Sequence, residues 1–273
     1  MPEIAEVETV RNTLKRQILN KKIKDVNILY DRIIECDLDL FKKALIGAKF
    51  INIDRKGKWL ILELNNDYDL LSHLRMEGKF FLKSHNDPIV KHEHIIITFV
   101  DNTDLRYHDT RKFGRMLIVK KDTLNDAPCL KKLGYEPNST NLTADYLLNK
   151  LKNKSITIKT LLLDQSIISG LGNIYANEVL FAAKINPFKK GQDISKKEAE
   201  RIVKASNEII SKAIMMGGTT IKSYTSSLGV TGMFQQELKV HKRDKEKCCV
   251  CGSVIEKQKL NGRTVYYCPK CQK

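Results

Sequence analysis

MPEIAEVE, residues 1–8, opens the chain and decides how its first domain begins. Apolar side chains continue from this stretch at the spacing of one helix face, at Ile4, Val7, Val10, Leu14 and Ile18. A proline before a helix and glutamates in its first turn are ordinary signals of a helix start. The stretch therefore predicts an N-terminal amphipathic helix, with or without chemistry at its end.

The same stretch also allows a nucleophilic terminus. Removal of Met1 would give Pro2 a free secondary amine. An α-amine titrates near ~7.8 and lysine near ~10.4, so far more of the α-amine is unprotonated at neutral pH. Glu3 and Glu6 are three residues apart and would lie beside this amine, while the positive end of the helix dipole would disfavour its protonation. These residues alone fit both a nucleophile and a plain helix start.

Length and charge limit the classes of protein that this chain can belong to. Its 273 residues exceed the usual single-domain length and suggest two domains. The net charge of +16 suits a polyanionic partner, either nucleic acid or an anionic membrane surface. No apolar run reaches the ~20 residues needed to span a bilayer, and the N-terminus lacks the pattern of a secretory signal. We therefore expect a soluble intracellular protein.

Strand patterns dominate residues 22–120. Apolar–polar alternation and β-branched runs predict an antiparallel sandwich or barrel. Three polar insertions interrupt the pattern, at residues 55–58, 72–78 and 106–114. The first could be a plain basic turn, and the second places Met76 either in a turn or in the core. The third mixes cations with aromatic rings, as nucleic-acid surfaces do.

Helical periodicity follows a polar linker at residues 121–142. The predicted helices include residues 147–151, 158–165, 174–184 and 196–216. The last begins with a Ser195–Glu198 capping box and ends at Gly217–Gly218. The glycine-bearing turn at 170–173 is typical of a nucleic-acid-binding helical hairpin, although an αα-corner has the same pattern. Residues 223–232 predict a mobile loop that is either a lid or a connection.

Five of the seven cysteines lie in the last 26 residues. Cys248-x2-Cys251 and Cys268-x2-Cys271 are separated by sixteen residues, which is the spacing of a four-thiolate structural zinc site. Cys249 has a poor spacing for a ligand and is left out. Between the two pairs, residues 261–264 predict the tip of a hairpin that carries Arg263.

Taken together, these motifs resemble those of a bacterial formamidopyrimidine-DNA glycosylase, a repair enzyme for oxidised purines, over essentially the whole chain. The resemblance rests on residues 2–3, 6–10, 57–58, 73–78, 91–94, 111–114, 163–165, 170–175, 234–237 and 268–272. It implies an α+β fold of two domains, with an N-terminal antiparallel β-sandwich that bears the first helix and a C-terminal helix-two-turns-helix domain with a four-cysteine zinc finger. The implied bounds are 1–130 for the sandwich, 131–142 for the linker, 143–240 for the helical domain and 241–273 for the finger.

The resemblance further implies a bifunctional enzyme that excises 8-oxoguanine and formamidopyrimidines and cleaves the strand by β,δ-elimination. Pro2 would attack C1′ and form a Schiff base, Glu3 would be the general acid/base, and Glu6 would support the site. Lys58 would donate a proton linked to β-elimination, and Arg263 would be linked to δ-elimination.

DNA contacts are implied in the same way. His92, Arg111, Asn173 and one of Lys154 and Lys159 would bind the DNA backbone. Met76, Arg111 and Phe113 would fill the gap left by the extruded base. The loop at 223–232 would close over that base. The implied partner is double-stranded DNA with oxidised bases or abasic sites, the metal is one structural Zn²⁺, and the enzyme would act as a monomer in the bacterial cytoplasm, at the nucleoid.

The chain departs from the family's pattern at four positions. Ala5, Thr110 and Tyr135 stand where the family usually has proline, and Asn177 stands where acidic residues are frequent. None of these departures removes a catalytic group. Two alternatives also fit part of this sequence pattern: the sister enzyme endonuclease VIII, which removes oxidised pyrimidines, and a non-catalytic DNA-binding zinc protein.

Overall fold

The computed structural model describes residues 1–219 and 232–273 and divides the chain into two compact units. Unit 1 comprises residues 1–131 and 219–232, and unit 2 comprises residues 132–218 and 233–273. The loop expected at 223–232 lies outside the described residues apart from Gly232. No helix in the described part of the chain is long and apolar enough to cross a membrane.

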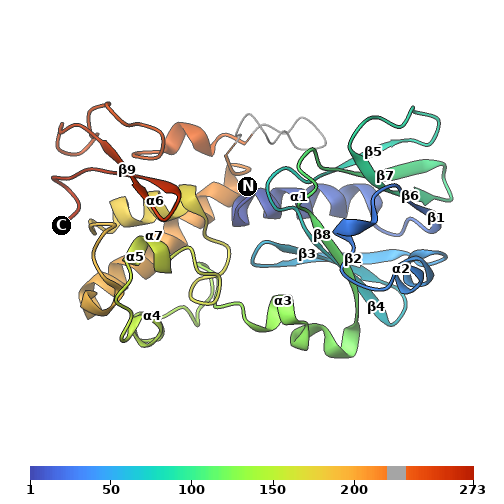
Figure 1. The fold of residues 1–273 in the computed structure, drawn as a ribbon, viewed down its shortest axis with the longest axis horizontal. Helices are drawn as coiled ribbons and strands as arrows, with labels where there is room; N and C mark the ends of the chain where they lie inside the picture. The colour runs from blue at the N-terminus through green and yellow to red at the C-terminus, as the bar shows by residue number, and fades with distance from the viewer. Residues whose placement is uncertain (220–231) are drawn as a thin grey trace. The chain divides into compact units, whose positions relative to one another are not determined.

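Unit 1 contains two four-stranded antiparallel sheets, with the strand orders β1-β6-β7-β5 and β2-β3-β4-β8 (Figure 1). The strands are β1 (Ile23–Ile28), β2 (Phe50–Lys56), β3 (Trp59–Leu64), β4 (Tyr68–His73), β5 (Lys79–Ser84), β6 (Glu93–Phe99), β7 (Thr103–His108) and β8 (Arg115–Lys120). Apolar side chains from both sheets form one core, which confirms the expected antiparallel strands.

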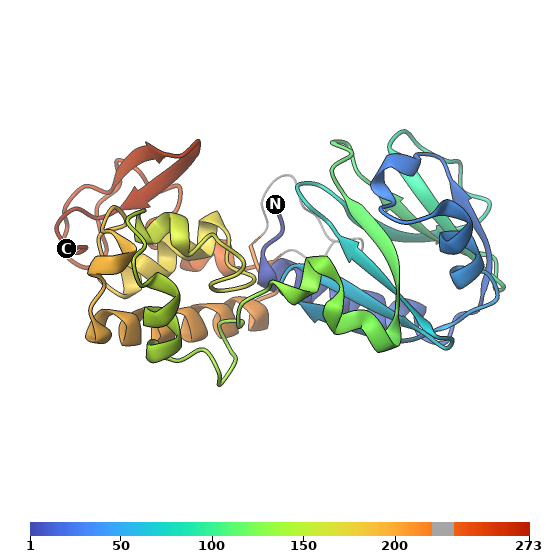
Figure 2. The ribbon, with the colours of Figure 1, turned by 60° about the horizontal axis from the view of Figure 1, so that its bottom comes forward.

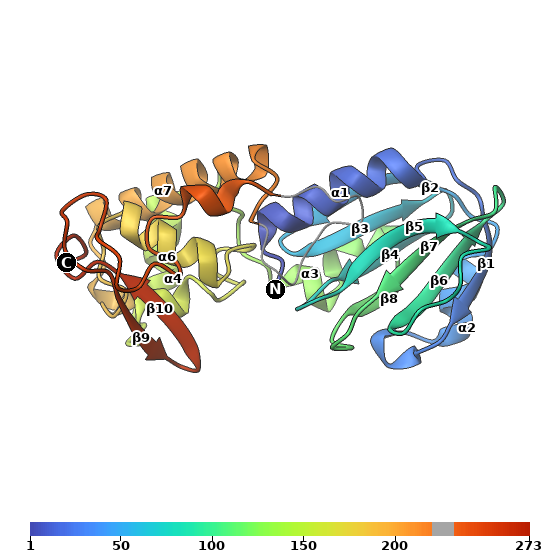
Figure 3. The same cartoon turned by 90° about the horizontal axis from the view of Figure 1, so that it is seen from above.

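The helices of unit 1 are short apart from the first. They are α1 (Ile4–Ile18), η1 (Asp31–Ile33), α2 (Leu38–Leu45), η2 (Lys121–Asp126) and α3 (Pro128–Lys131). Helix α1 packs along β2 and β3 (Figure 3). The five apolar residues of its predicted face are all buried, with at most 5% exposed. Burying each such side chain is worth roughly 1.5–3 kcal/mol, so this face fixes the helix on the sheet.

A buried arginine holds the loop between β5 and β6. Arg106 is 1% exposed and pairs with Glu93 at 3.1 Å and with Asp104 at 3.0 Å. The same guanidinium donates to the backbone carbonyls of Ser84, Asp87 and Pro88. These hydrogen bonds fix the loop to β7, which carries Arg106. Breaking them by removing the arginine would leave the buried charges of Glu93 and Asp104 without this partner, which is strongly destabilising.

Unit 2 is built from helices and one hairpin. Its elements are α4 (Ala144–Leu151), α5 (Ile158–Leu161), α6 (Asn173–Ala182), η3 (Gly191–Asp193), α7 (Lys196–Met215), η4 (Phe234–Glu237), β9 (Glu256–Leu260) and β10 (Arg263–Tyr267). Helix α6 is buried over most of its length and packs against α7 and β10. The predicted Ser195–Glu198 capping box of α7 is confirmed, and Gly217 and Gly218 follow the helix with φ of 73° and 76°.

One predicted helix is shorter than expected. The periodicity of residues 158–165 predicted a single helix, but α5 ends at Leu161. The carboxylate of Asp164 accepts the backbone N–H and the hydroxyl of Ser166, at 2.9 and 2.8 Å, and this local turn replaces the next helical turn. The side-chain amide of Gln165 donates to the carbonyl of Leu171, which closes the turn before α6.

The β9–β10 hairpin has the two-residue turn that its sequence predicted. Asn261 and Gly262 connect the strands with φ of 48° and 74°, the left-handed conformations that such a tight turn requires. Figure 2 shows this dark-red hairpin beside the helices of unit 2. Arg263 is the first residue after the turn and is exposed.

Candidate active site and nucleic-acid interface

The N-terminus of α1 is held by a buried carboxylate. Pro2 is buried, and Glu3 and Glu6 are only 3% and 4% exposed. One oxygen of Glu6 accepts the backbone N–H of Glu3 at 2.8 Å. Its other oxygen accepts the backbone N–H and the hydroxyl of Thr219 at 2.7 and 2.9 Å. Glu6 therefore joins the chain terminus to a residue more than 200 positions away.

The terminal amine lies among charged groups. Burial lowers the pKa of the Met1 α-amine, the carboxylates of Glu3 and Glu6 oppose this shift, Lys58 adds to it, and Glu77 opposes it. The amine is therefore within electrostatic reach of two buried carboxylates and one buried lysine. Removal of Met1 would make Pro2, which is buried and precedes Glu3, the terminal amine.

Lys58 is positioned by a braced hairpin turn. The residue is 5% exposed and follows Gly57, whose φ is 60°, in the turn between β2 and β3. Arg55 donates to the carbonyl of Gly57 at 2.8 Å and to the carboxylate of Glu8, on α1, at 2.9 Å. Because the turn is tied to α1, the lysine is fixed relative to the terminus.

A neutral histidine lies next to this lysine, and sequence reasoning did not single it out. Burial, followed by the charges of Arg75, Lys58 and Arg115, lowers the pKa of His73 to about 3. Its Nδ1 accepts the backbone N–H of Arg75 at 3.0 Å, and its ring lies edge-on to Trp59. His73 therefore organises the turn that leads to Met76. The sequence signal was its place at the end of a strand and directly before that turn.

The three residues expected to fill a gap in DNA lie on two loops of unit 1. Met76 is half-buried on the turn between β4 and β5. Arg111 and Phe113 are exposed on the loop between β7 and β8, and the Arg111 guanidinium lies 4.9 Å from the centre of the Phe113 ring. This pair combines a cation with an aromatic face, a combination suited to an unstacked base. His92 is half-buried, with a left-handed φ of 74°.

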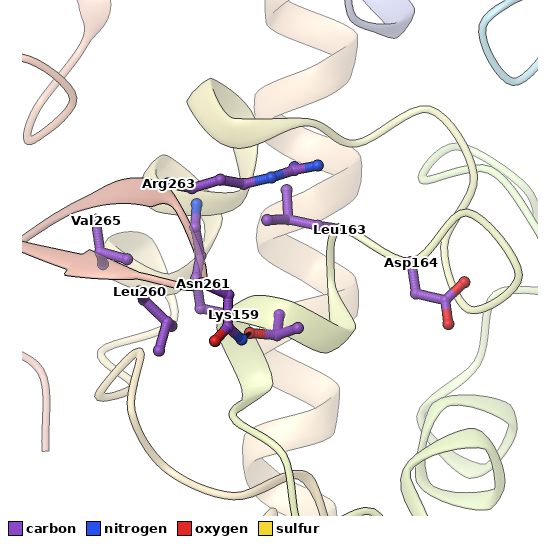
Figure 4. A pocket seen from close by; sticks show the side chains of 8 residues that line it. Lys159, Leu163, Asp164, Leu260, Asn261, Arg263 and Val265 are labelled. Carbon is purple, nitrogen blue, oxygen red and sulfur yellow. Dashed lines mark hydrogen bonds between the residues drawn. The ribbon is translucent and has the colours of Figure 1, made fainter.

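Arg263 lines a cavity of about 300 Å³ in unit 2. The hairpin contributes Leu260, Asn261 and Arg263, and the segment that contains α5 contributes Lys159, Thr160 and Leu163. Figure 4 shows the Arg263 side chain extending from the hairpin toward Leu163, whereas Asp164 points away. The side-chain amide of Asn261 donates to the hydroxyl of Thr160 at 3.3 Å, so the hairpin tip is fixed to α5.

The structure separates the two lysines that the sequence left as alternatives. Lys154 is exposed, whereas Lys159 is fully buried and its Nζ donates to the backbone carbonyl of Asn173 at 3.0 Å. The side-chain amide of Asn173 donates to the carbonyl of Thr264 at 3.0 Å. Lys159 and Asn173 thus connect α5, the start of α6 and the hairpin.

The four predicted zinc ligands form one cluster. The sulfur atoms of Cys248, Cys251, Cys268 and Cys271 all lie within 4.8 Å of one another. Two of the separations are 3.5 and 3.8 Å, close to the edge of about 3.8 Å expected for tetrahedral zinc with Zn–S bonds of about 2.3 Å. The donor set therefore fits one structural zinc ion. Cys249 is exposed and stands outside the cluster, as expected.

Within each unit, the predicted residues occupy a limited region. In unit 1, the structure brings Glu3, Glu6 and Lys58 to the terminal amine. In unit 2, it brings Lys159 and Arg263 to one cavity. The first group can supply a nucleophile with acid and base partners, and in the second the exposed Arg263 can supply positive charge to an anion.

Family models cover most of the chain. Residues 1–116 match the formamidopyrimidine-DNA glycosylase N-terminal domain, residues 133–225 match the H2TH domain of the same glycosylase, and residues 245–273 match a zinc finger found in FPG and IleRS. The order and spacing of these matches follow the two units and the cysteine cluster.

Individual relatives match from end to end. The formamidopyrimidine-DNA glycosylase of Lactobacillus helveticus is 44% identical over 272 residues, which covers 100% of this chain and 99% of that protein. A structure of Lactococcus lactis Fpg with DNA that contains an abasic site is 39% identical, covers 99% of both chains and has a TM-score of 0.93. A structure of the same enzyme with DNA that contains N7-benzyl-Fapy-dG is 39% identical, covers 100% of both chains and has a TM-score of 0.94.

Proposed function

The chain belongs to the formamidopyrimidine-DNA glycosylase family, and from this premise we propose how its own residues perform the reaction. The protein is a DNA glycosylase of base-excision repair that also has abasic-site lyase activity. We propose that Pro2, once Met1 is removed, is its nucleophile. The observation that supports this most directly is the buried Pro2 just before α1, next to a terminal amine whose pKa burial lowers and on which the charges of Glu3, Glu6 and Lys58 act.

The proposed chemistry begins at C1′ of the damaged nucleotide. The lone pair of the Pro2 nitrogen forms a bond to C1′, and the bond from C1′ to the base breaks, so the base leaves with its electron pair and takes up a proton. The nitrogen then loses its own proton. Opening of the sugar breaks C1′–O4′ and gives the iminium ion, with Glu3 donating the proton that O4′ takes up.

Strand cleavage follows from the iminium ion. Loss of a proton from C2′ expels the 3′ phosphate. We propose that Lys58 donates the proton that the departing phosphate takes up. In a second elimination, loss of a proton from C4′ expels the 5′ phosphate, and we assign to Arg263 the stabilisation of the negative charge that develops on this phosphate. Glu6 has a supporting role, because both of its oxygens are occupied by hydrogen bonds to the backbone or to Thr219.

Binding requires that the damaged base leaves the duplex. Extrusion costs a few kcal/mol in stacking and pairing, and we propose that Met76, Arg111 and Phe113 fill the gap. Arg111 also binds the DNA backbone, together with His92, Asn173 and Lys154. Lys159 acts indirectly, because its Nζ donates to the carbonyl of Asn173 and holds that residue in place. The single zinc ion holds the finger that carries Arg263.

The preferred lesions are 8-oxoguanine and formamidopyrimidines in double-stranded DNA. We propose that the enzyme acts as a monomer, with the bacterial nucleoid as its place of action. The alternative closest in chemistry is removal of oxidised pyrimidines, and it uses the same nucleophile, so only a comparison of lesions separates the two.

Borohydride trapping tests the proposal. The wild-type protein is incubated with duplexes that contain 8-oxoguanine opposite cytosine, thymine glycol or an abasic site, and the adduct is mapped by mass spectrometry. We expect an adduct on Pro2 with the first and third duplexes, and weaker trapping with thymine glycol. The double variant Pro2→Gly with Glu3→Gln should lose the adduct, whereas Asp39→Asn on α2 should retain it.

Two results would contradict the assignment. One is an intact Met1 in the active protein, and the other is undiminished trapping in the double variant. Binding to the duplexes with no cleavage at the abasic site would instead indicate a DNA-binding protein without catalysis. Preferential trapping on thymine glycol would indicate the pyrimidine specificity of endonuclease VIII.

A further inference from the structure

Asp109 is fully buried at the base of the loop that carries Arg111 and Phe113. Its carboxylate accepts three backbone N–H groups of this loop, from Arg111 at 3.0 Å, Phe113 at 3.0 Å and Gly114 at 2.8 Å. Its carbonyl accepts a fourth, from Lys112, at 3.3 Å. A single residue therefore accepts four backbone N–H groups of a turn that has no regular secondary structure.

The backbone of Asp109 is itself anchored on the neighbouring strand. Its N–H donates to the carbonyl of His92 at 3.0 Å, and its carbonyl lies 2.8 Å from Nε2 of His94. His92 is one of the proposed DNA contacts. Asp109 thus connects the loop of Arg111 and Phe113 with His92 and with His94 at the start of β6.

The loop of Met76 is joined to the same structure. Tyr107, which is 1% exposed, lies against both Gly78 and Gly114, and a Cβ built at either glycine would overlap its hydroxyl. The hydroxyl of Thr110 donates to the carboxylate of Glu77. Two loops that are separate in sequence are therefore held together at two points.

The contrast between side chains and backbone is informative. Arg111 and Phe113 are exposed, yet the backbone beneath them is fixed, and Lys112 between them has a left-handed φ of 57°. A non-glycine residue keeps such a conformation only where its surroundings enforce it. Here the surroundings are the hydrogen bonds to Asp109.

We propose that Asp109 is a positioning residue that pre-forms the surface that fills the gap in the duplex. The proposal rests on the function proposed above. Because Asp109 already orders the loop of Arg111 and Phe113, no further entropy is lost in ordering it when the base is extruded. Asp109 should therefore increase the rate only on substrates in which the duplex must be opened. Asp109 touches neither the nucleophile nor the sugar, and its effect acts through Arg111 and Phe113.

The test compares two substrates for the variant Asp109→Asn. The new amide group faces backbone N–H donors with a donor of its own, so at least one hydrogen bond is lost while the shape is retained. Single-turnover rates are measured for excision of 8-oxoguanine from a duplex and for cleavage of an abasic site in a single strand, which needs no duplex opening. We expect the duplex rate to fall roughly tenfold, the factor that corresponds to one net hydrogen bond, and the single-strand rate to change less than about twofold.

Two further variants separate positioning from general destabilisation. Asp37→Ala removes the cap of α2, where the carboxylate accepts the N–H of Leu40 at 2.8 Å, and should destabilise unit 1 without changing the ratio of the two rates. Asp109→Ser is a second replacement that removes the carboxylate. Both Asp109 variants should increase amide hydrogen exchange in residues 110–115, and Asp37→Ala should not.

If the ratio of the duplex rate to the single-strand rate is unchanged in both Asp109 variants, whether neither rate falls or both fall equally, the proposal is overturned. A wild-type protein that is inactive on both substrates would instead contradict the proposed function itself. The two failures are therefore distinguishable in one experiment.

Discussion

Unit 1 and unit 2 hold the charges of the proposed site in different ways. Around the terminus in unit 1, Glu3, Glu6 and Lys58 are at most 5% exposed and are placed by a large apolar core with hydrogen bonds above it. In unit 2, Arg263 is exposed on a two-stranded hairpin whose base is four thiolates with a small apolar cluster. Burial changes the pKa of an ionisable group, whereas the metal-held hairpin holds an arginine at the surface. Substitutions of the groups around the terminus should therefore change rates, and loss of the metal-held finger should mainly change binding.

The largest expected effect is on the chemical step in unit 1. Glu3→Gln removes the proposed proton donor and should reduce excision of 8-oxoguanine by about 10²–10⁴-fold, the range of general acid–base catalysis. Affinity for the lesion duplex should stay almost unchanged because the substitution keeps the shape of the side chain. Single-turnover excision and fluorescence anisotropy on the same duplex measure both quantities. A parallel loss of affinity would break the contrast between the units.

Loss of the metal should have the opposite signature. Cys268→Ser removes one zinc ligand and should weaken lesion binding at least about tenfold, because metal binding and folding of such a finger are coupled. The comparison variant is Cys249→Ser, which changes an exposed cysteine outside the cluster and should bind normally. Bound zinc and the dissociation constant are measured for both. Full affinity in a zinc-free Cys268→Ser protein would show that the finger does not position Arg263.

Acid should destabilise unit 1 through His73. Its pKa is about 3 in the folded protein and about 6.5 when unfolded, so the unfolded state binds a proton that the folded state does not. Stability is therefore fully present above pH 6.5 and is lost as the pH falls toward 3, by up to about 1.4 kcal/mol per pH unit. Denaturant unfolding at pH 7 and 5.5 should show a smaller loss for His73→Gln than for the wild-type protein. Equal losses would mean that His73 is protonated in the fold.

The smallest expected effect separates the two lysines of unit 2. Lys154→Ala should lower the slope of log affinity against log salt by about 0.9, the value for one phosphate contact, and leave thermal stability unchanged. Lys159→Ala should lower the melting temperature, because it leaves the carbonyl of Asn173 without this donor. Salt titrations and thermal unfolding of both variants measure this. The reverse pattern would assign the contact to Lys159.

Local patterns predicted much of the fold. The apolar face of α1, the capping box of α7, the Asn261–Gly262 turn and the cysteine spacing are each a pattern within one short stretch of the chain, so they could be predicted from the sequence. The early end of α5 could not, because the Asp164–Ser166 turn competes with a helix that has the same periodicity.

Contacts between distant residues were out of reach of the sequence. The bond from Thr219 to Glu6 spans 213 positions, and nothing near either residue indicates it. The burial of Lys159 and Arg106 was missed for the same reason, since charged side chains normally predict a surface. Asp109 lies inside the polar insertion at residues 106–114, but its neighbours Arg111 and Phe113 carry the chemical signal and conceal its role.

The packing of Tyr107 against Gly78 and Gly114 restricts how this protein can change over evolutionary time. The two glycines lie far apart in the sequence, yet they share one constraint, because the same aromatic ring occupies the space in which a side chain would lie. Drift at either position is blocked while the ring remains, and a smaller residue at position 107 would release both at once. Among natural variants we therefore expect these three positions to change as a set, with the ring lost before either glycine.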